Sequence, residues 1–145
     1  MDIQPADTML LILVGKEDST VGTYDGERIF HETTAVASTS KALLMMHSDD
    51  HGAPALVANH RSPSAMLNSD GSFATEAFRP GTNRDTTDIG VVDALDYLGT
   101  WRLLDQLLEA AFFGPPNADF FEDPKLLGMG SWSDGVPVKP LTRLE

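Results

Sequence analysis

The sequence of 145 residues contains no cysteine. Without a thiol the chain can form no disulfide, no thiolate metal site and no cysteine nucleophile, so several enzyme classes are excluded. A chain without disulfides fits the reducing interior of a cell. We therefore expect a cytoplasmic protein, or part of a particle that is assembled inside the cell.

Basic residues are also scarce. Ten Lys and Arg stand against 22 Asp and Glu, which gives a formal net charge of −12 at pH 7. Binding nucleic acid through its phosphates requires a basic face, and anionic lipid attracts basic segments in the same way. We expect neither kind of partner. Acidic residues spread along the chain favour solubility, and the alternative role is a surface matched to a basic partner, for example as a DNA mimic.

Long apolar runs are absent as well. The run at residues 9–14 is far shorter than the roughly 20 apolar residues that cross a membrane. Asp2 and Asp7 precede this run, where a secretory signal would carry Lys or Arg. The sequence therefore predicts a soluble protein without a membrane segment, and its length fits one domain.

The sequence pattern of residues 8–76 is typical of β structure. The apolar run from Thr8 to Val14, followed by Gly15, predicts a strand in the centre of a sheet. Asp25-Gly26 and Asp70-Gly71 each stand between β-prone runs, and Asp-Gly is a strong hairpin signal because both turn residues need positive φ. We therefore predict an antiparallel sheet with two Asp-Gly hairpins.

Two helices are expected. Residues 41–47 follow a Ser/Thr cluster that could cap a helix and are rich in Ala, Leu and Met, so we predict a short helix, with a strand as the alternative. A long amphipathic helix is predicted from residue 88 to residue 113, ended by Gly114 and two prolines. Its apolar face follows spacings of three and four and comprises Val91, Ala94, Leu95, Leu98, Trp101, Leu104, Leu108, Ala111 and Phe112. Packed on the sheet, this face would complete an α+β domain over residues 1–113.

Residues 114–145 form the third zone. Five prolines predict an extended C-terminal arm that joins neither a helix nor the centre of a sheet. Apolar residues recur along this arm, so we expect it to dock on its own domain or on a neighbouring chain, with Phe121 and Trp132 buried.

The histidines and carboxylates of His47-Ser48-Asp49-Asp50-His51 are the best candidate for chemistry. Imidazole and carboxylate bind zinc and non-haem iron, and histidines four residues apart share a helix face. The spacing differs from His-Glu-x-x-His, and Ser-Asp-Asp is ordinary turn chemistry. We predict a solvated turn, with no bound metal and no cofactor. A small metal-dependent or acid–base enzyme built on His47, Asp49, Asp50 and His51 is the alternative function.

Residues 14–20 resemble a phosphate loop only in part. They lack the first glycine of a P-loop, and Lys16 is followed by Glu17 rather than by Ser or Thr. Two carboxylates would repel a phosphate there, so we predict a polar turn between two strands.

The pairs Phe112-Phe113 and Phe120-Phe121 flank the double proline. They either cap the core of their own domain or form an exposed anchor for a partner, because aromatic residues dominate the energetics of protein interfaces. We predict a non-enzymatic interaction or assembly protein, either a structural subunit or an acidic adaptor or inhibitor. It would bind a protein partner, or its own copies, through the long helix and the arm. The predicted partner-binding residues are Phe112, Phe113, Phe120, Phe121 and Trp132.

Overall fold

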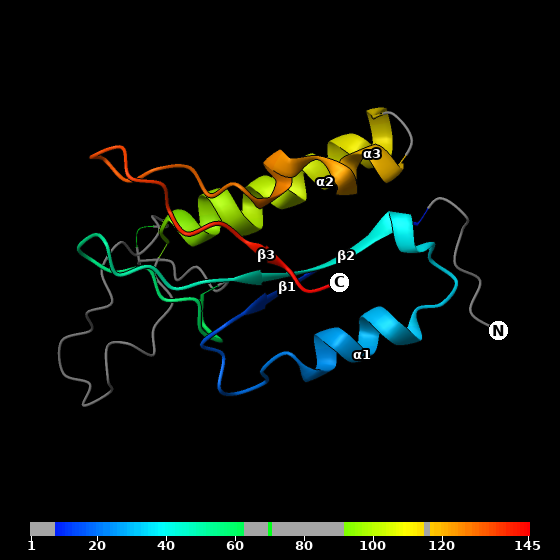
Figure 1. The fold of residues 1–145 in the computed structure, drawn as a ribbon, viewed down its shortest axis with the longest axis horizontal. Helices are drawn as coiled ribbons and strands as arrows, with labels where there is room; N and C mark the ends of the chain where they lie inside the picture. Colours follow the sequence, from blue (N-terminus) through cyan, green and yellow to red (C-terminus); the bar gives the residue numbers. More distant parts are fainter. Residues whose placement is uncertain (1–7, 63–69, 71–91, 115–116) are drawn as a thin grey trace.

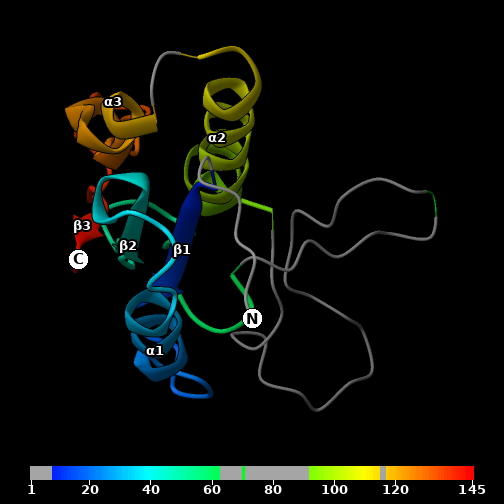
Figure 2. The same ribbon diagram turned by 90° about the vertical axis from the view of Figure 1, so that its right-hand side faces the viewer.

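The computed structural model describes residues 8–62, 70, 92–114 and 117–145. Within these ranges a three-stranded sheet, in the order β1-β2-β3, lies between helix α1 on one face and helices α2 and α3 on the other (Figures 1 and 2). The predicted α+β class is confirmed at this level. None of the helices in the described part of the chain is long and apolar enough to cross a membrane.

Strand β1 (Leu10–Gly15), helix α1 (Tyr24–Glu32) and strand β2 (Lys41–Met46) form a β-α-β unit. The two strands are parallel, with Leu10 opposite Lys41 and Gly15 opposite Met46. The predicted antiparallel sheet is therefore wrong for this pair, because a helix rather than a hairpin connects the two strands, and the sheet is mixed. The predicted strand in the run from Thr8 to Val14 is present, but in the described part of the sheet β1 lies at an edge rather than in the centre. Its residues are all partly exposed.

The hairpin predicted at Asp25-Gly26 is wrong, because both residues lie in the first turn of α1. Gly26 is needed there for packing rather than for a turn. A Cβ on Gly26 would lie 2.9 Å from Cγ1 of Val14 and 3.3 Å from Cγ2 of Ile12, so this glycine lets α1 approach the sheet closely. The second predicted hairpin, at Asp70-Gly71, extends outside the described residues.

The short helix predicted over residues 41–47 is also wrong, and the alternative strand is present as β2. The 3-10 turn η1 (Ser38–Ser40) precedes it. Ala42, Leu43 and Leu44 are fully buried, which makes β2 the centre of the described sheet. Lys41 is buried as well, and its Nζ donates to the carbonyl oxygens of Phe30 and Thr33 at the C-terminal end of α1.

The other face of the sheet is covered by one continuous helical stretch. A π-helical segment, η3 (Leu95–Trp101), leads into α2 (Arg102–Phe113), which is followed by Gly114 as predicted. The predicted start at residue 88 lies outside the described residues. Leu95 and Leu103 enter the core, whereas three members of the predicted buried face, Leu104, Leu108 and Phe112, are 50%, 45% and 73% exposed. The helix is apolar on two sides, so the spacing alone could not identify the side that faces the sheet.

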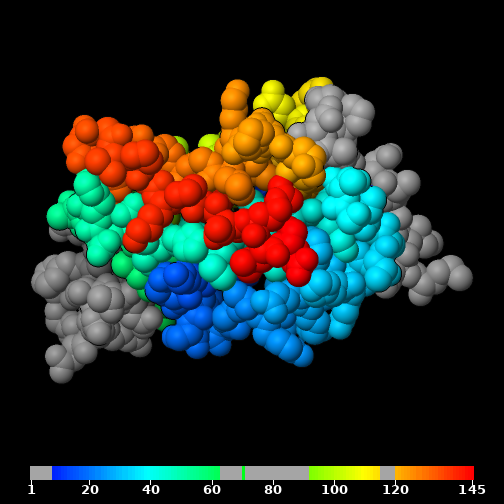
Figure 3. Space-filling model, viewed as in Figure 1, coloured from blue at the N-terminus to red at the C-terminus, as the bar shows by residue number. Residues whose placement is uncertain are grey.

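The C-terminal segment is folded rather than extended. It forms α3 (Asn117–Glu122), η4 (Pro124–Leu127) and β3 (Thr142–Arg143), and β3 pairs antiparallel with β2. The prediction that proline would exclude helices here is wrong. Helix α3 contains no proline, and Pro124 is the first residue of η4, where no backbone N–H is required. In the space-filling view the last residues (red) lie between the orange and cyan parts of the surface (Figure 3). The segment docks on its own chain and adds to the core Phe121, Leu126, Met129, Val138 and Leu141.

A pair of aspartates begins the η3–α2 stretch. Oδ1 of Asp93 accepts a hydrogen bond from the N–H of Leu95, and Oδ2 of Asp96 accepts one from the N–H of Asp93. This is the reciprocal arrangement of a capping box. Oδ1 of Asp96 is buried and, within the described ranges, without a hydrogen-bond partner. Burial raises the pKa of Asp96, and burial together with the nearby Asp96 charge raises the pKa of Asp93.

The Gly26→Val substitution tests the packing role of Gly26. We expect it to lower the free energy of unfolding by about 1–3 kcal/mol, because the added methyl groups overpack the space next to Val14. Glu27→Val on the exposed side of the same helix turn is the matched control, with an expected effect within about 0.5 kcal/mol. Urea unfolding measures both. Equal losses in the two variants would contradict the packing role of Gly26.

The Asp96→Asn substitution tests the buried carboxyl. Burial raises the pKa of Asp96 in the folded state above its value in the unfolded chain. The contribution of this carboxyl to stability is therefore complete below the unfolded pKa, where it is neutral in both states, and it is lost as the pH rises through the folded pKa. We therefore expect the variant, which carries no charge, to be more stable than the wild type at pH 7, with the difference shrinking toward pH 3.8. Urea unfolding from pH 3 to pH 8 measures it. Asp50→Asn, on a side chain 95% exposed, is the control. A difference independent of pH would contradict the assignment.

Candidate functional site

The five predicted partner-binding residues differ in how far they are buried. Phe112 and Phe113 are 73% and 88% exposed at the end of α2, and Phe120 is partly buried. Phe121 is 1% exposed and belongs to the core, so the expectation that it is buried is confirmed, but it offers no surface to a partner. Trp132 is only partly buried.

Trp132 is held within its own chain. Its indole N–H donates to Oδ2 of Asp49 at 3.1 Å, and its ring lies so close to Gly52 that a Cβ there would be 2.1 Å from Cζ3. Gly52 is therefore required for the approach of the indole. The contact fixes the C-terminal segment against the loop that follows β2, and part of the Trp132 side chain stays exposed.

A groove of about 490 Å³ lies between the end of α2 and the start of the C-terminal segment. It brings together Phe113 and Phe120, two of the predicted binding residues. The carboxylates of Glu109 and Asp123 also line it, and the described lining contains no Lys or Arg. The remaining lining residues are Gln106, Ala110, Gly114 and Leu126.

Arg102, on the same helix, is occupied by structural contacts. Its guanidinium donates to the carbonyl oxygens of Leu98, Leu126 and Gly128, at 2.6, 3.1 and 2.8 Å. These hydrogen bonds connect α2 to the segment around η4. The charge of Arg102 is therefore directed at backbone carbonyl groups, and the groove keeps an acidic lining.

The side chains of the cluster from His47 to His51 point in different directions and have separate contacts. The ring of His47 contacts Oγ1 of Thr142, and Nε2 of His51 lies 2.7 Å from Oδ2 of Asp134. Asp50 projects into solvent. Across the described ranges, no group of three or more His, Asp and Glu side chains is arranged to hold a metal ion.

Asp49 is the one buried member of that cluster. Its carboxylate accepts hydrogen bonds from the N–H groups of Lys139 and His51 and from the indole of Trp132. The hydrogen bond from Lys139 contributes most to lowering the pKa of Asp49 below its ordinary value; burial opposes this shift. These contacts give Asp49 a structural role.

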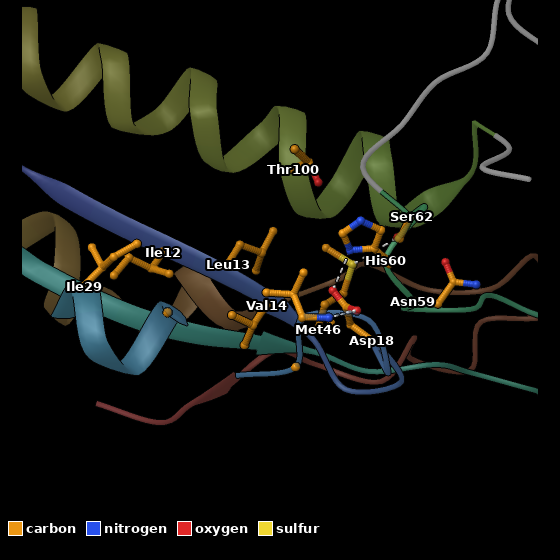
Figure 4. A pocket seen from close by; sticks show the side chains of 14 residues that line it. Ile12, Leu13, Val14, Asp18, Ile29, Met46, Asn59, His60, Ser62 and Thr100 are labelled. Carbon is orange, nitrogen blue, oxygen red and sulfur yellow. Dashed lines mark hydrogen bonds and ion pairs between the residues drawn. The ribbon is translucent and has the colours of Figure 1, made fainter. Parts of the chain in front are cut away.

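A second cavity, of about 440 Å³, lies along β1 near the carboxyl ends of the parallel strands (Figure 4). Asp18 and His60 stand at this cavity, with Oδ2 of Asp18 3.1 Å from Nδ1 of His60. Asp18 comes from the loop between β1 and α1, and His60 from the segment after β2. The predicted turn between two strands at residues 14–20 is wrong, because this loop leads into a helix.

Asp18 is held by its own loop. Oδ1 accepts hydrogen bonds from the N–H groups of Thr20 and Val21, both at 2.9 Å. Burial by itself raises the pKa of Asp18, but the Val21 N–H, the His60 ring and the Thr20 N–H together bring it below the ordinary value. The ionised carboxylate therefore fixes His60 with the proton on Nδ1.

Sequence reasoning did not find the Asp18–His60 pair. The position of Asp18 after an apolar strand and a glycine was the available signal. Nothing in the local pattern around His60 indicates that it contacts a residue 42 positions earlier. Comparison with protein-family models, with curated proteins and with solved structures gives no significant match, so function has to be inferred from this geometry.

The protonation state of the His60 ring tests the pairing with Asp18. We expect neutral His60 to carry its proton on Nδ1, and Asp18→Ala to shift the population toward Nε2–H. Long-range ¹H–¹⁵N NMR spectra distinguish the two forms. His31, whose Nε2 lies 3.6 Å from Glu145, serves as the internal control and should not respond. Dominant Nε2–H at His60 in the wild type would contradict the pairing.

Proposed function

We propose that this protein is a non-enzymatic interaction protein whose α2–α3 groove binds an arginine-containing segment of a basic protein partner. The observation that supports the proposal most directly is the lining of that groove. Two phenylalanines, Phe113 and Phe120, lie beside two carboxylates, Glu109 and Asp123, with no basic residue in the described lining.

An arginine side chain suits this combination of groups. Its flat guanidinium stacks on aromatic rings and forms paired hydrogen bonds with carboxylates. Its alkyl part covers apolar surface while the charged end reaches an acidic rim. Phe113 is 88% exposed, so it gains most by being covered. Aromatic residues in such positions contribute strongly to protein interfaces.

Charge favours a basic partner over a second copy of this chain. Each copy carries a formal net charge of −12, so two copies repel one another, whereas a basic protein is attracted before contact. Electrostatic complementarity of this kind raises association rates and rejects wrong partners. The acidic composition and the groove therefore favour the same class of partner.

A synthetic amphipathic peptide of Leu and Arg provides the probe, with the corresponding Leu and Glu peptide as its matched control. We expect the Arg peptide to bind, and Phe113→Ala to weaken its binding about 5- to 30-fold. Phe112→Ala is the matched control on the same helix, because Phe112 is exposed but lies outside the groove lining, and its effect should stay below about twofold. Titration calorimetry measures the affinities.

A second experiment tests the electrostatic part of the binding. Glu109→Gln should weaken binding of the Arg peptide, and higher salt should weaken it in the wild type because these charges are partly screened. Equal binding of the Glu peptide, or equal losses in Phe112→Ala and Phe113→Ala, would contradict the proposal. Self-association that Phe113→Ala abolishes would instead assign the groove to a second copy.

A further inference from the structure

The cavity beside β1 has the position and size of a small-molecule site. In open α/β sheets, ligands bind beyond the carboxyl ends of parallel strands, and this cavity lies there for β1 and β2. Its volume of about 440 Å³ is within the range of roughly 300–1,000 Å³ typical of ligand pockets. It shares no lining residue with the α2–α3 groove.

The lining is mainly apolar, with a few polar groups at one end. Figure 4 shows Ile12 and Ile29 at the far end from His60, and Thr100 on the helical segment above. Thr100 belongs to η3, and short π-helical segments are frequent at functional sites. Gly15, Gly22 and Gly26 all line the cavity, so backbone as well as side chains forms its wall. A ligand would thus place an apolar body against β1 and α1.

The polar end is preorganised and carries negative charge. The carboxylate of Asp18 is only 13% exposed and accepts hydrogen bonds from Thr20, Val21 and His60. It occupies the backbone N–H groups that a phosphate would need, so the loop cannot serve as a phosphate loop. With Nδ1 of His60 bound to Asp18, Nε2 is an acceptor directed away from the carboxylate. None of the described residues hydrogen-bonds to this nitrogen.

The geometry points to a binding site for a small, predominantly apolar amine or N–H heterocycle. Its apolar part lies against Ile12 and Ile29, and its N–H group donates to Nε2 of His60. A positive charge on the ligand is favoured by Asp18, and an anion is disfavoured.

Four indole compounds test these requirements separately. Indole carries the N–H donor, 1-methylindole lacks it, tryptamine adds a positive charge and indole-3-propionate adds a negative one. We expect 1-methylindole to bind about fivefold more weakly than indole. At low salt, indole-3-propionate should bind at least about tenfold more weakly than tryptamine. ¹H–¹⁵N NMR titration of the full chain gives the affinities, and shifts of the Gly22 and Gly26 amide signals locate the site.

Variants decide whether binding occurs in this cavity. Ile29→Trp fills the cavity from α1 and should abolish the shifts, whereas Tyr24→Trp, on an exposed position of the same helix outside the lining, should leave them unchanged. His60→Leu should remove the preference for indole over 1-methylindole without preventing binding of either. Absence of binding by all four compounds, equal affinities for all four, or shifts that persist in Ile29→Trp would each overturn the assignment.

Discussion

The carboxylate of Asp49 fastens the C-terminal part of the chain to the end of the central strand. It accepts hydrogen bonds from His51, Trp132 and Lys139, and the last two lie more than 80 residues along the chain. The backbone of Asp49 also exchanges two hydrogen bonds with Leu56, which fixes the loop beneath Trp132. The same contacts hold the chain that leads to β3, so they support the alignment of β3 on β2 and the burial of Val138 and Leu141. Substitution of Asp49 would leave three donors without their acceptor.

The sequence predicts the mixed α+β class, and it predicts the positions of the apolar segments better than their conformation. Residues 41–46 form a strand although Ala, Leu and Met favour a helix, because a short apolar run is stable in whichever element the surrounding structure buries. Asp25-Gly26 fits a tight turn equally well in isolation. Its helical conformation follows from the close contact of Gly26 with β1, which no local pattern reveals. The end of α2 at Gly114 was predictable because glycine and proline act locally.

The candidate sites show the same division. Exposed aromatic residues at the end of α2 follow from composition and helix termination, so Phe112 and Phe113 could be proposed from the sequence. Whether Phe120 or Phe121 faces solvent depends on how α3 packs, and only the structure shows that Phe121 is in the core. The groove further requires Glu109 and Asp123, which belong to different segments. The Asp18–His60 pair is a purely tertiary contact, and for that reason periodicity and motif spacing could not detect it.

The two edges of β2 are closed by segments at very different distances along the chain. Its partner β1 lies about thirty residues before it, whereas β3 lies about one hundred residues after it. The extra loop entropy is modest, about 1 kcal/mol, but contacts between residues far apart in sequence form slowly. During synthesis the β1-α1-β2 unit emerges long before the residues that cover its second edge. Until residues 142–145 arrive, the N–H and C=O groups of Leu43 remain open to pairing with other nascent chains, so aggregation competes with folding in that interval.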